Sequence, residues 1–195
     1  MDPRKPREYI LELFADPTSV RDVVKGVLHT IFFHRYFPCF RPVSFEVLDL
    51  TLPAIDDANV ESYIDSRVNT LIQQHLSSSS NFPNGGVRGR VVVHFFEKRR
   101  RKSGLWFGGK NEEQVCWETW TIDITIAVPR TESERIKVRR AMEKMLRKAA
   151  LKIVTIVNRD RDHIPPITTS DANPFPYEIV LNPKSEHWSE RLGLY

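Results

Sequence analysis

Two strand-like segments that flank a short polar stretch constrain the fold of this chain most strongly. Residues 115–128 alternate between large apolar and polar side chains, and residues 90–98 form a second run rich in valine and phenylalanine. Clean alternation is typical of a strand with one buried and one solvated face, as in an antiparallel sheet. Two such strands predict a long hairpin with residues 99–114 as its tip. Its buried face is expected to carry Trp120, Ile122, Ile124, Ile126 and Val128.

Three amphipathic helices are predicted around this hairpin, because apolar residues recur at helical spacing in three other segments. The buried sides are expected to run from Val20 to Ile31, from Val60 to Ile72 and from Ile136 to Ile156. The third helix has a strongly cationic outer side. The helices are expected at residues 20–36, 57–76 and 132–159, and the pairs at capping-box spacing are Ser19 with Asp22 and Thr131 with Glu134.

Three further strands complete the predicted order. Residues 9–14 read as a short edge strand, residues 43–52 as a strand ended by Pro53, and residues 177–181 as a final strand. The order is therefore strand, helix, strand, helix, hairpin, helix, strand. This order predicts an α+β fold in which helices stack on an antiparallel sheet.

An aromatic pair lies in the predicted hairpin tip. Trp106 and Phe107 are followed by Gly108 and Gly109, with charged residues on both sides. Large aromatic side chains are normally drawn into a core, where each removes about 150–250 Å² from water. Here no strand or helix is predicted that would carry them inward, and exposed aromatic side chains often mark a surface for a partner. One interpretation is a tip that folds back on its own sheet; we favour a protruding binding finger.

The basic residues allow a second interpretation. The formal net charge of the 195-residue chain is +4, and the excess is concentrated at residues 98–102 and along the third helix. These groups are able to contact phosphates of nucleic acid or of an anionic membrane. The alternative function is therefore a nucleic-acid- or anionic-membrane-binding module that uses Lys98–Lys102 and the long basic helix. Against nucleic acid, Glu112, Glu113 and Glu118 soon reverse the local charge, and no nucleic-acid-binding motif accompanies the patch.

The sequence contains no motif of a known catalytic, metal or nucleotide site. It lacks a phosphate-binding loop, a nucleophile elbow and a His-Glu-x-x-His pattern. Its histidines are scattered, and Cys39 and Cys116 are too far apart for metal-ligand spacing or a disulfide framework. No apolar run approaches the ~20 residues of a membrane span. We therefore expect a protein that is not an enzyme, has no cofactor or metal, and works in the cytosol or nucleus.

Several short motifs occur in an order that is specific enough to reveal a family resemblance. They are Val27-Leu28-His29-Thr30 with His34-Arg35, the basic stretch before Trp106-Phe107, Trp117-Glu118-Thr119-Trp120-Thr121, and Val157-Asn158-Arg159 with Ile164-Pro165. In this order the chain resembles the autophagy-related protein 101 family, HORMA-domain subunits of the complex that initiates autophagy. The resemblance extends over roughly residues 20–181.

The resemblance implies a fold and a function. It implies one HORMA domain over residues 1–195, with three helices on a three-stranded antiparallel sheet and no catalysis. It also implies a heterodimer with the HORMA domain of autophagy-related protein 13, which this chain would stabilise within the autophagy-initiation kinase complex. Trp106 and Phe107 would form the finger that recruits downstream autophagy factors. His34 and Arg35 would contribute to the partner surface, unless they only finish the first helix. The implied location is the cytoplasm, with recruitment to the pre-autophagosomal structure.

Two departures from the animal members of the family refine these expectations. In animal members a proline separates the tryptophan and phenylalanine of the finger, whereas Trp106 and Phe107 are adjacent. The chain also ends soon after its last predicted strand, with a short C-terminal segment at residues 165–195. Both features favour a fungal-type member. Because residues 165–183 are short and broken by prolines, we expect no remodelling of a C-terminal segment around a peptide.

Overall fold

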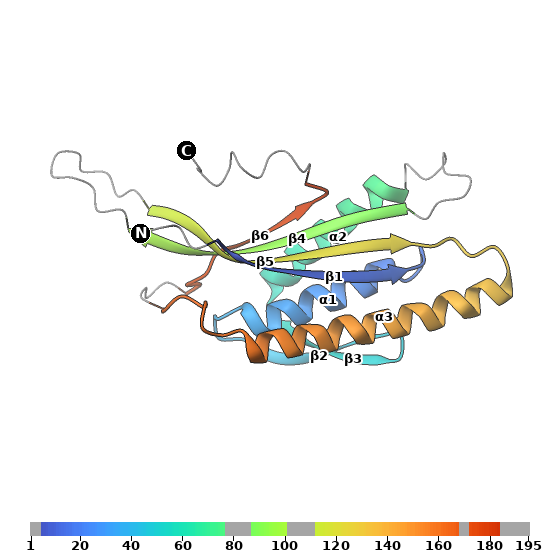
Figure 1. Cartoon of the computed structure of the whole chain (residues 1–195), viewed down its shortest axis with the longest axis horizontal. Helices are drawn as coiled ribbons and strands as arrows, with labels where there is room; N and C mark the ends of the chain where they lie inside the picture. Colours follow the sequence, from blue (N-terminus) through green and yellow to red (C-terminus); the bar gives the residue numbers. More distant parts are fainter. Residues whose placement is uncertain (1–4, 77–86, 101–111, 168–171, 184–195) are drawn as a thin grey trace.

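Three helices lie against one face of a four-stranded sheet, and a small hairpin lies on the far side of the helices (Figure 1). The computed structural model describes residues 5–76, 87–100, 112–167 and 172–183. In chain order its elements are β1 (Arg7–Ala15), α1 (Val20–Arg35), β2 (Arg41–Val47), β3 (Leu50–Asp56), α2 (Ala58–Leu76), β4 (Val87–Arg100), β5 (Glu112–Ile126), α3 (Glu132–Arg159) and β6 (Tyr177–Leu181).

The large sheet has the strand order β1-β5-β4-β6. The three strands β5, β4 and β6 pair antiparallel, whereas β1 pairs parallel to β5. The predicted α+β class, with three helices on a mainly antiparallel sheet, is confirmed, and the arrangement agrees with the HORMA fold that the resemblance implies. The sequence pattern of residues 9–14 predicted an edge strand correctly but gave no sign of its parallel pairing.

The helix α1 lies at the centre of the fold. Its predicted apolar residues are all buried, from Val20 to Ile31, and they face both the sheet and the β2–β3 hairpin. A helix that is apolar around most of its circumference is typically enclosed between two layers of the fold. The α2 and α3 helices also match their predicted ranges within one residue at each end. Their buried sides complete one hydrophobic core.

The segment predicted as one strand ended by Pro53 is instead a hairpin of two strands. β2 pairs antiparallel with β3 through a tight turn at Leu48 and Asp49, and Pro53 lies inside β3. Leu48 adopts a left-handed backbone with φ of 53°, a conformation that is uncommon for residues other than glycine and asparagine. Alternation of side chains continued through this turn, so the pattern showed no break. The prediction of a single strand is therefore wrong.

The two predicted capping boxes have different outcomes. Thr131 and Glu134 form the predicted reciprocal hydrogen bonds at the start of α3. The Ser19 side chain makes no capping hydrogen bond at the start of α1, and Asp16 accepts hydrogen bonds from the backbone of Thr18 and Ser19 instead. The prediction of a capping box at Ser19 and Asp22 is wrong, because the preceding turn is closed by Asp16.

Most of the predicted core is confirmed on β5. Trp120, Ile122, Ile124 and Ile126 are buried toward the helices. Val128 lies beyond the strand and Ile136 lies in the first turns of α3, and both side chains are exposed. These two predictions of buried residues are wrong because β5 ends at Ile126 and the N-terminal part of α3 extends past the sheet (Figure 1).

Candidate protein-interaction site

The candidate interaction site is the end of the β4–β5 hairpin that extends beyond the rest of the large sheet (Figure 1). β6 pairs with β4 only as far as Phe95, and β1 pairs with β5 only from Glu118 onward. Beyond these residues β4 and β5 continue alone to Arg100 and Glu112. We call this two-stranded ribbon, residues 96–100 with 112–117, the hairpin stem.

The predicted binding residues Trp106 and Phe107 belong to the segment between the two strands of the stem. Residues 101–111 lie outside the described residues, so the exposure of these rings stays a prediction. Residues 99–100 and 112–114 were expected in the loop but lie in strands. The stem is therefore longer than the sequence pattern predicted.

A β-bulge marks the root of the stem. The register of the two strands shifts between Phe95 and Phe96, which leaves Trp117 as the extra residue on β5. The Trp117 indole is buried, and its ring centroid lies 5.3 Å from that of Phe175 and 5.6 Å from that of His163. A bulge redirects a strand and increases its twist. Trp117 thus packs the root of the stem against residues that follow α3.

A buried carboxylate lies beside the bulge. Glu118 is fully buried, and its two oxygens accept hydrogen bonds from Arg35 Nε at 2.8 and 3.0 Å. Trp120 Nε1 donates to Glu118 Oε1 at 2.5 Å, and His163 Nε2 lies 2.6 Å from Glu118 Oε2. A buried charge is tolerated when an opposite charge and further hydrogen bonds satisfy it. This cluster, which we call the Glu118 cluster, joins α1, β5 and the segment after α3 at the root of the stem.

The Glu118 cluster extends to the end of α3. The Tyr9 hydroxyl donates to Asp160 Oδ2 at 3.1 Å, and Arg35 Nη2 donates to the Asp160 carbonyl at 3.2 Å. Burial raises the pKa of Tyr9, with the charges of Glu118 and Asp160 adding to the effect. Hydrogen bonds from Arg159, together with the one from Tyr9, hold the pKa of Asp160 at about 2. Over the physiological pH range the Tyr9 hydroxyl therefore stays protonated, and the Asp160 carboxylate stays ionised.

His34 and Arg35, the two residues that the resemblance placed at a partner surface, have different environments in the structure. Arg35 is buried, with 3% of its side chain exposed, and its guanidinium is used by Glu118. His34 is half-buried, and burial lowers its pKa, with the Arg35 charge adding to this. A partner would have to open the ion pair to reach Arg35, so we assign Arg35 an internal role.

Sequence reasoning missed Glu118 and His163 as parts of a site. The available signal was the position of Glu118, two residues before Trp120 and in phase with the apolar face of the strand. A carboxylate at a core-facing strand position requires a cationic partner. The sequence contained no indication that Arg35, which is 83 residues away, is that partner.

The basic stretch Lys98–Lys102 lies partly in the stem. Residues 101–102 lie outside the described residues. Arg99 pairs with Glu97 on its own strand, and the register places Glu113 directly opposite it. Opposite charges across a ribbon stabilise the pairing of its strands. The described part of the basic stretch thus supports the stem itself, which weakens the interpretation of a basic hairpin that binds phosphates.

A second polar group lies on the other face of the stem root. His94 is paired across the strands with Thr119, and its Nδ1 lies 3.0 Å from Thr119 Oγ1. Both side chains are buried, and the Cys116 thiol lies 3.5 Å from Thr119 Oγ1. Burial lowers the pKa of His94 to about 4 and raises that of Cys116. Both groups are neutral at pH 7 and act in packing rather than as a base and a nucleophile.

The buried His94 predicts a loss of stability in mild acid. Its pKa lies below the value of 6.5 for an exposed histidine. The unfolded chain therefore binds a proton more readily, and stability falls as the pH drops from about 6.5 toward 4. Between pH 7 and pH 5 we expect the wild type to lose about 2 kcal/mol more than His94→Gln, as measured by urea unfolding at both pH values. An equal loss in both proteins would contradict the assignment.

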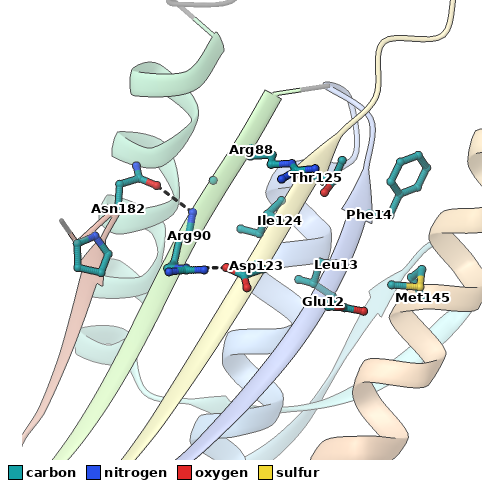
Figure 2. Close-up of a pocket in the computed structure, with 12 residues that line it drawn as sticks. Glu12, Leu13, Phe14, Arg88, Arg90, Asp123, Ile124, Thr125, Met145 and Asn182 are labelled. Carbon is teal, nitrogen blue, oxygen red and sulfur yellow. Dashed lines mark hydrogen bonds and ion pairs between the residues drawn. The ribbon is translucent and has the colours of Figure 1, made fainter. Parts of the chain in front are cut away.

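One hollow lies along the large sheet and is bordered by strand residues and by Met145 of α3 (Figure 2). It has a volume of about 640 Å³, and residues of β1, β4 and β5, both polar and apolar, line it together with Asn182 and Pro183. Arg90 Nε donates to Asp123 Oδ1 at 2.6 Å, and the Asn182 side chain accepts a hydrogen bond from the Arg90 backbone at 2.9 Å. The lining contains no histidine, cysteine or serine. Arg90, Asp123 and Asn182 in the lining thus form hydrogen bonds with one another.

The described parts of the chain hold no group of three histidine, cysteine or acidic residues placed to bind a metal ion. Among the helices of the described residues, none is long and apolar enough to cross a membrane.

Comparison with known proteins finds one family. A sequence profile described as "Autophagy-related protein 101" matches residues 12–171. Proteins named "Autophagy-related protein 101" are similar over most of their length. The one from Schizosaccharomyces pombe is 29% identical over 88% of this chain and 84% of its own, and the one from Arabidopsis thaliana is 26% identical over 90% and 86%. The human protein is 20% identical over 89% of this chain and 87% of its own.

Proposed function

Because the chain belongs to the autophagy-related protein 101 family, we propose that it is a non-catalytic adaptor subunit of the autophagy-initiation complex. A role in autophagy follows from the family itself. The proposal adds two binding functions. One surface pairs with the HORMA domain of autophagy-related protein 13 and stabilises it, and the Trp106-Phe107 finger recruits downstream autophagy factors.

The projecting stem is the observation that carries this proposal. It leads from the sheet to the segment that contains Trp106 and Phe107, and its root is fixed by Trp117 and the Glu118 cluster. Burying two aromatic rings in a partner contributes several kcal/mol gross, at about 25 cal/mol per Å². The cost of ordering a binding segment reduces this gain. A stem anchored at its root lowers that cost, which suits a segment that presents aromatic rings.

The polar groups of the described residues support a binding function rather than a catalytic one. The buried Glu118 is used by Arg35, and Asp123 is used by Arg90. A catalytic pair requires a nucleophile or base with a free position for a substrate next to it. Among the described residues, these two polar clusters join one element to another, as expected for a scaffold.

Pairing with the second HORMA domain is testable with two purified proteins. We expect this chain and the HORMA domain of autophagy-related protein 13 to elute together in size-exclusion chromatography. A partner that binds only the folded state stabilises it by about 2.7 kcal/mol at a concentration of 100 times Kd. The thermal midpoint of the mixture should therefore exceed those of both components. Separate elution at micromolar concentration, with unchanged midpoints, would contradict the pairing.

We also propose that the protein resides in the cytoplasm and is recruited to the pre-autophagosomal structure. Recruitment through protein partners requires no membrane-spanning segment of its own. In starved cells, a fluorescent fusion should form puncta that also contain the second HORMA protein. A diffuse signal in cells where that partner still forms puncta would contradict the proposal.

A further inference from the structure

A row of basic side chains lies on the outer side of α3. Nine of the 28 residues of this helix are lysine or arginine, and only three are glutamate. Several of the cations have partners, including Arg139 with Asp49 and Glu143. Six exposed cations of α3 form no ion pair with any residue that the structure describes, and four of the six are the lysines and arginines of residues 140–148. We call these four, Arg140, Lys144, Arg147 and Lys148, the α3 basic stripe.

The four cations share one face because of the helical repeat. At 100° per residue they fall within an arc of about 100°, and at 1.5 Å per residue they extend over about 12 Å. No carboxylate of α3 falls within that arc. Glu132 and Glu134 lie in the first turn, and Glu143 lies to one side and pairs with Arg139. The outermost face of the helix is therefore positively charged without local compensation.

This arrangement opposes the stability of the helix. Like charges at i and i+4 repel, and the stripe contains two such pairs, Arg140 with Lys144 and Lys144 with Lys148. α3 packs against β1, α1 and β3, whereas these four exposed cations form no hydrogen bond or ion pair with a described residue. A repulsive and unpaired row of charges is consistent with an anionic ligand outside the chain.

Apolar side chains continue the same face toward the end of α3. Leu151 lies in the arc of the stripe with 61% of its surface exposed, and Val154 lies at the edge of the arc with 38% exposed. Basic residues followed by exposed aliphatic residues on one helix face suit the boundary between lipid headgroups and acyl chains. Single-stranded nucleic acid is instead gripped by aromatic rings that stack on bases, and α3 has none.

We propose that the α3 basic stripe docks the protein on an anionic membrane surface, with Leu151 and Val154 entering the headgroup layer. The cations attract acidic lipid headgroups, and their alignment along a straight helix lets them contact one flat surface together. The proposal does not depend on Trp106 and Phe107 or on a second HORMA domain.

Vesicle flotation of the whole purified chain tests the proposal. We expect binding to phosphatidylcholine vesicles that contain phosphatidylserine, weak binding to pure phosphatidylcholine, and release by added salt. Each neutralised cation should reduce the partition coefficient about fivefold. The variant with Arg140, Lys144, Arg147 and Lys148 all changed to glutamine should therefore lose on the order of 100-fold or more. Leu151→Ser should reduce binding without changing its dependence on salt.

A matched control separates the stripe from net charge. Changing Arg7, Arg21, Arg41 and Arg88 to glutamine removes the same charge from exposed positions on other elements, and this variant should bind almost as the wild type does. The Trp106→Ala, Phe107→Ala double variant should bind fully, and a loss there would assign the vesicle contact to the finger and overturn the proposal.

Two further results would overturn the proposal. One is a wild type that does not float with the anionic vesicles, or a stripe variant that floats as well as the wild type. The other is tighter binding to double-stranded RNA than to the vesicles, abolished in the same variant. That outcome would assign the stripe to nucleic acid.

Discussion

Replacing Glu118 with alanine is expected to lower the free energy of unfolding by about 3–5 kcal/mol, because the change leaves the Arg35 charge buried without its partner. Arg35 is 3% exposed and cannot reach water without moving the end of α1. The Trp120 and His163 hydrogen bonds to the carboxylate are lost as well. Urea unfolding followed by fluorescence measures the change. A loss below about 1 kcal/mol, the typical size for an exposed ion pair, would contradict the role of the cluster.

A double-mutant cycle distinguishes a lost partner from a general loss of packing. Changing both Arg35 and Glu118 to leucine removes the two charges together, and replacing a buried ion pair by apolar residues is often much less costly than breaking it. We therefore expect the double variant to be more stable than either single variant, Arg35→Leu or Glu118→Leu. Additive losses from the two single changes would show that Arg35 and Glu118 act independently.

Trp120→Ala is expected to destabilise the fold by about 3–5 kcal/mol. Trp120 is fully buried on β5, and its ring centroid lies 4.7 Å from that of Tyr9. Removal leaves a cavity beneath the sheet and takes a hydrogen-bond donor away from Glu118. The measurement is again equilibrium unfolding, with Trp120→Phe as a milder variant that keeps most of the volume.

Trp106 and Phe107 provide the contrast to Trp120. If these rings belong to an exposed finger, the double alanine variant should unfold within about 0.5 kcal/mol of the wild type, as surface substitutions usually do. A loss close to that of Trp120→Ala would show that the finger rings form part of a core and would contradict the assignment of an exposed binding segment.

The sequence predicted the long elements of the fold well. The periodic apolar residues of α1 and α3 and the strict alternation along β5 reflect burial on one face, and burial is what the structure shows there. The capping box of Thr131 and Glu134, which depends on two residues three positions apart, was also confirmed. Such patterns predict structure well because each depends only on residues a few positions apart in the sequence.

The features that were missed depend on contacts between distant segments. The turn at Leu48 lies within a run of alternating apolar and polar residues. The sequence of residues 43–52 therefore did not indicate a hairpin. The parallel pairing of β1 with β5 joins segments more than 100 residues apart. Ile136 has helical spacing with the core of α3 but lies where α3 has no sheet beside it.

The candidate site shows the same division. Trp106 and Phe107 were proposed from the local sequence, because aromatic residues beside glycines and charges are conspicuous, and their role stays a prediction. The contacts at the root of the hairpin stem were not predicted. Glu118 meets Arg35 and His163 only after α1, β5 and the segment after α3 come together, and Trp117 becomes part of the root only through a shift in strand register.

Capture of the tagged chain from extract of its own cells tests the proposed adaptor function most directly, with the wild type compared to the Trp106→Ala, Phe107→Ala variant. We predict that both baits recover the second HORMA protein and the kinase subunits, and that a further set of autophagy proteins is missing from the variant alone. Identical sets from the two baits would contradict recruitment by the finger. Absence of the second HORMA protein from both baits would contradict the adaptor function itself.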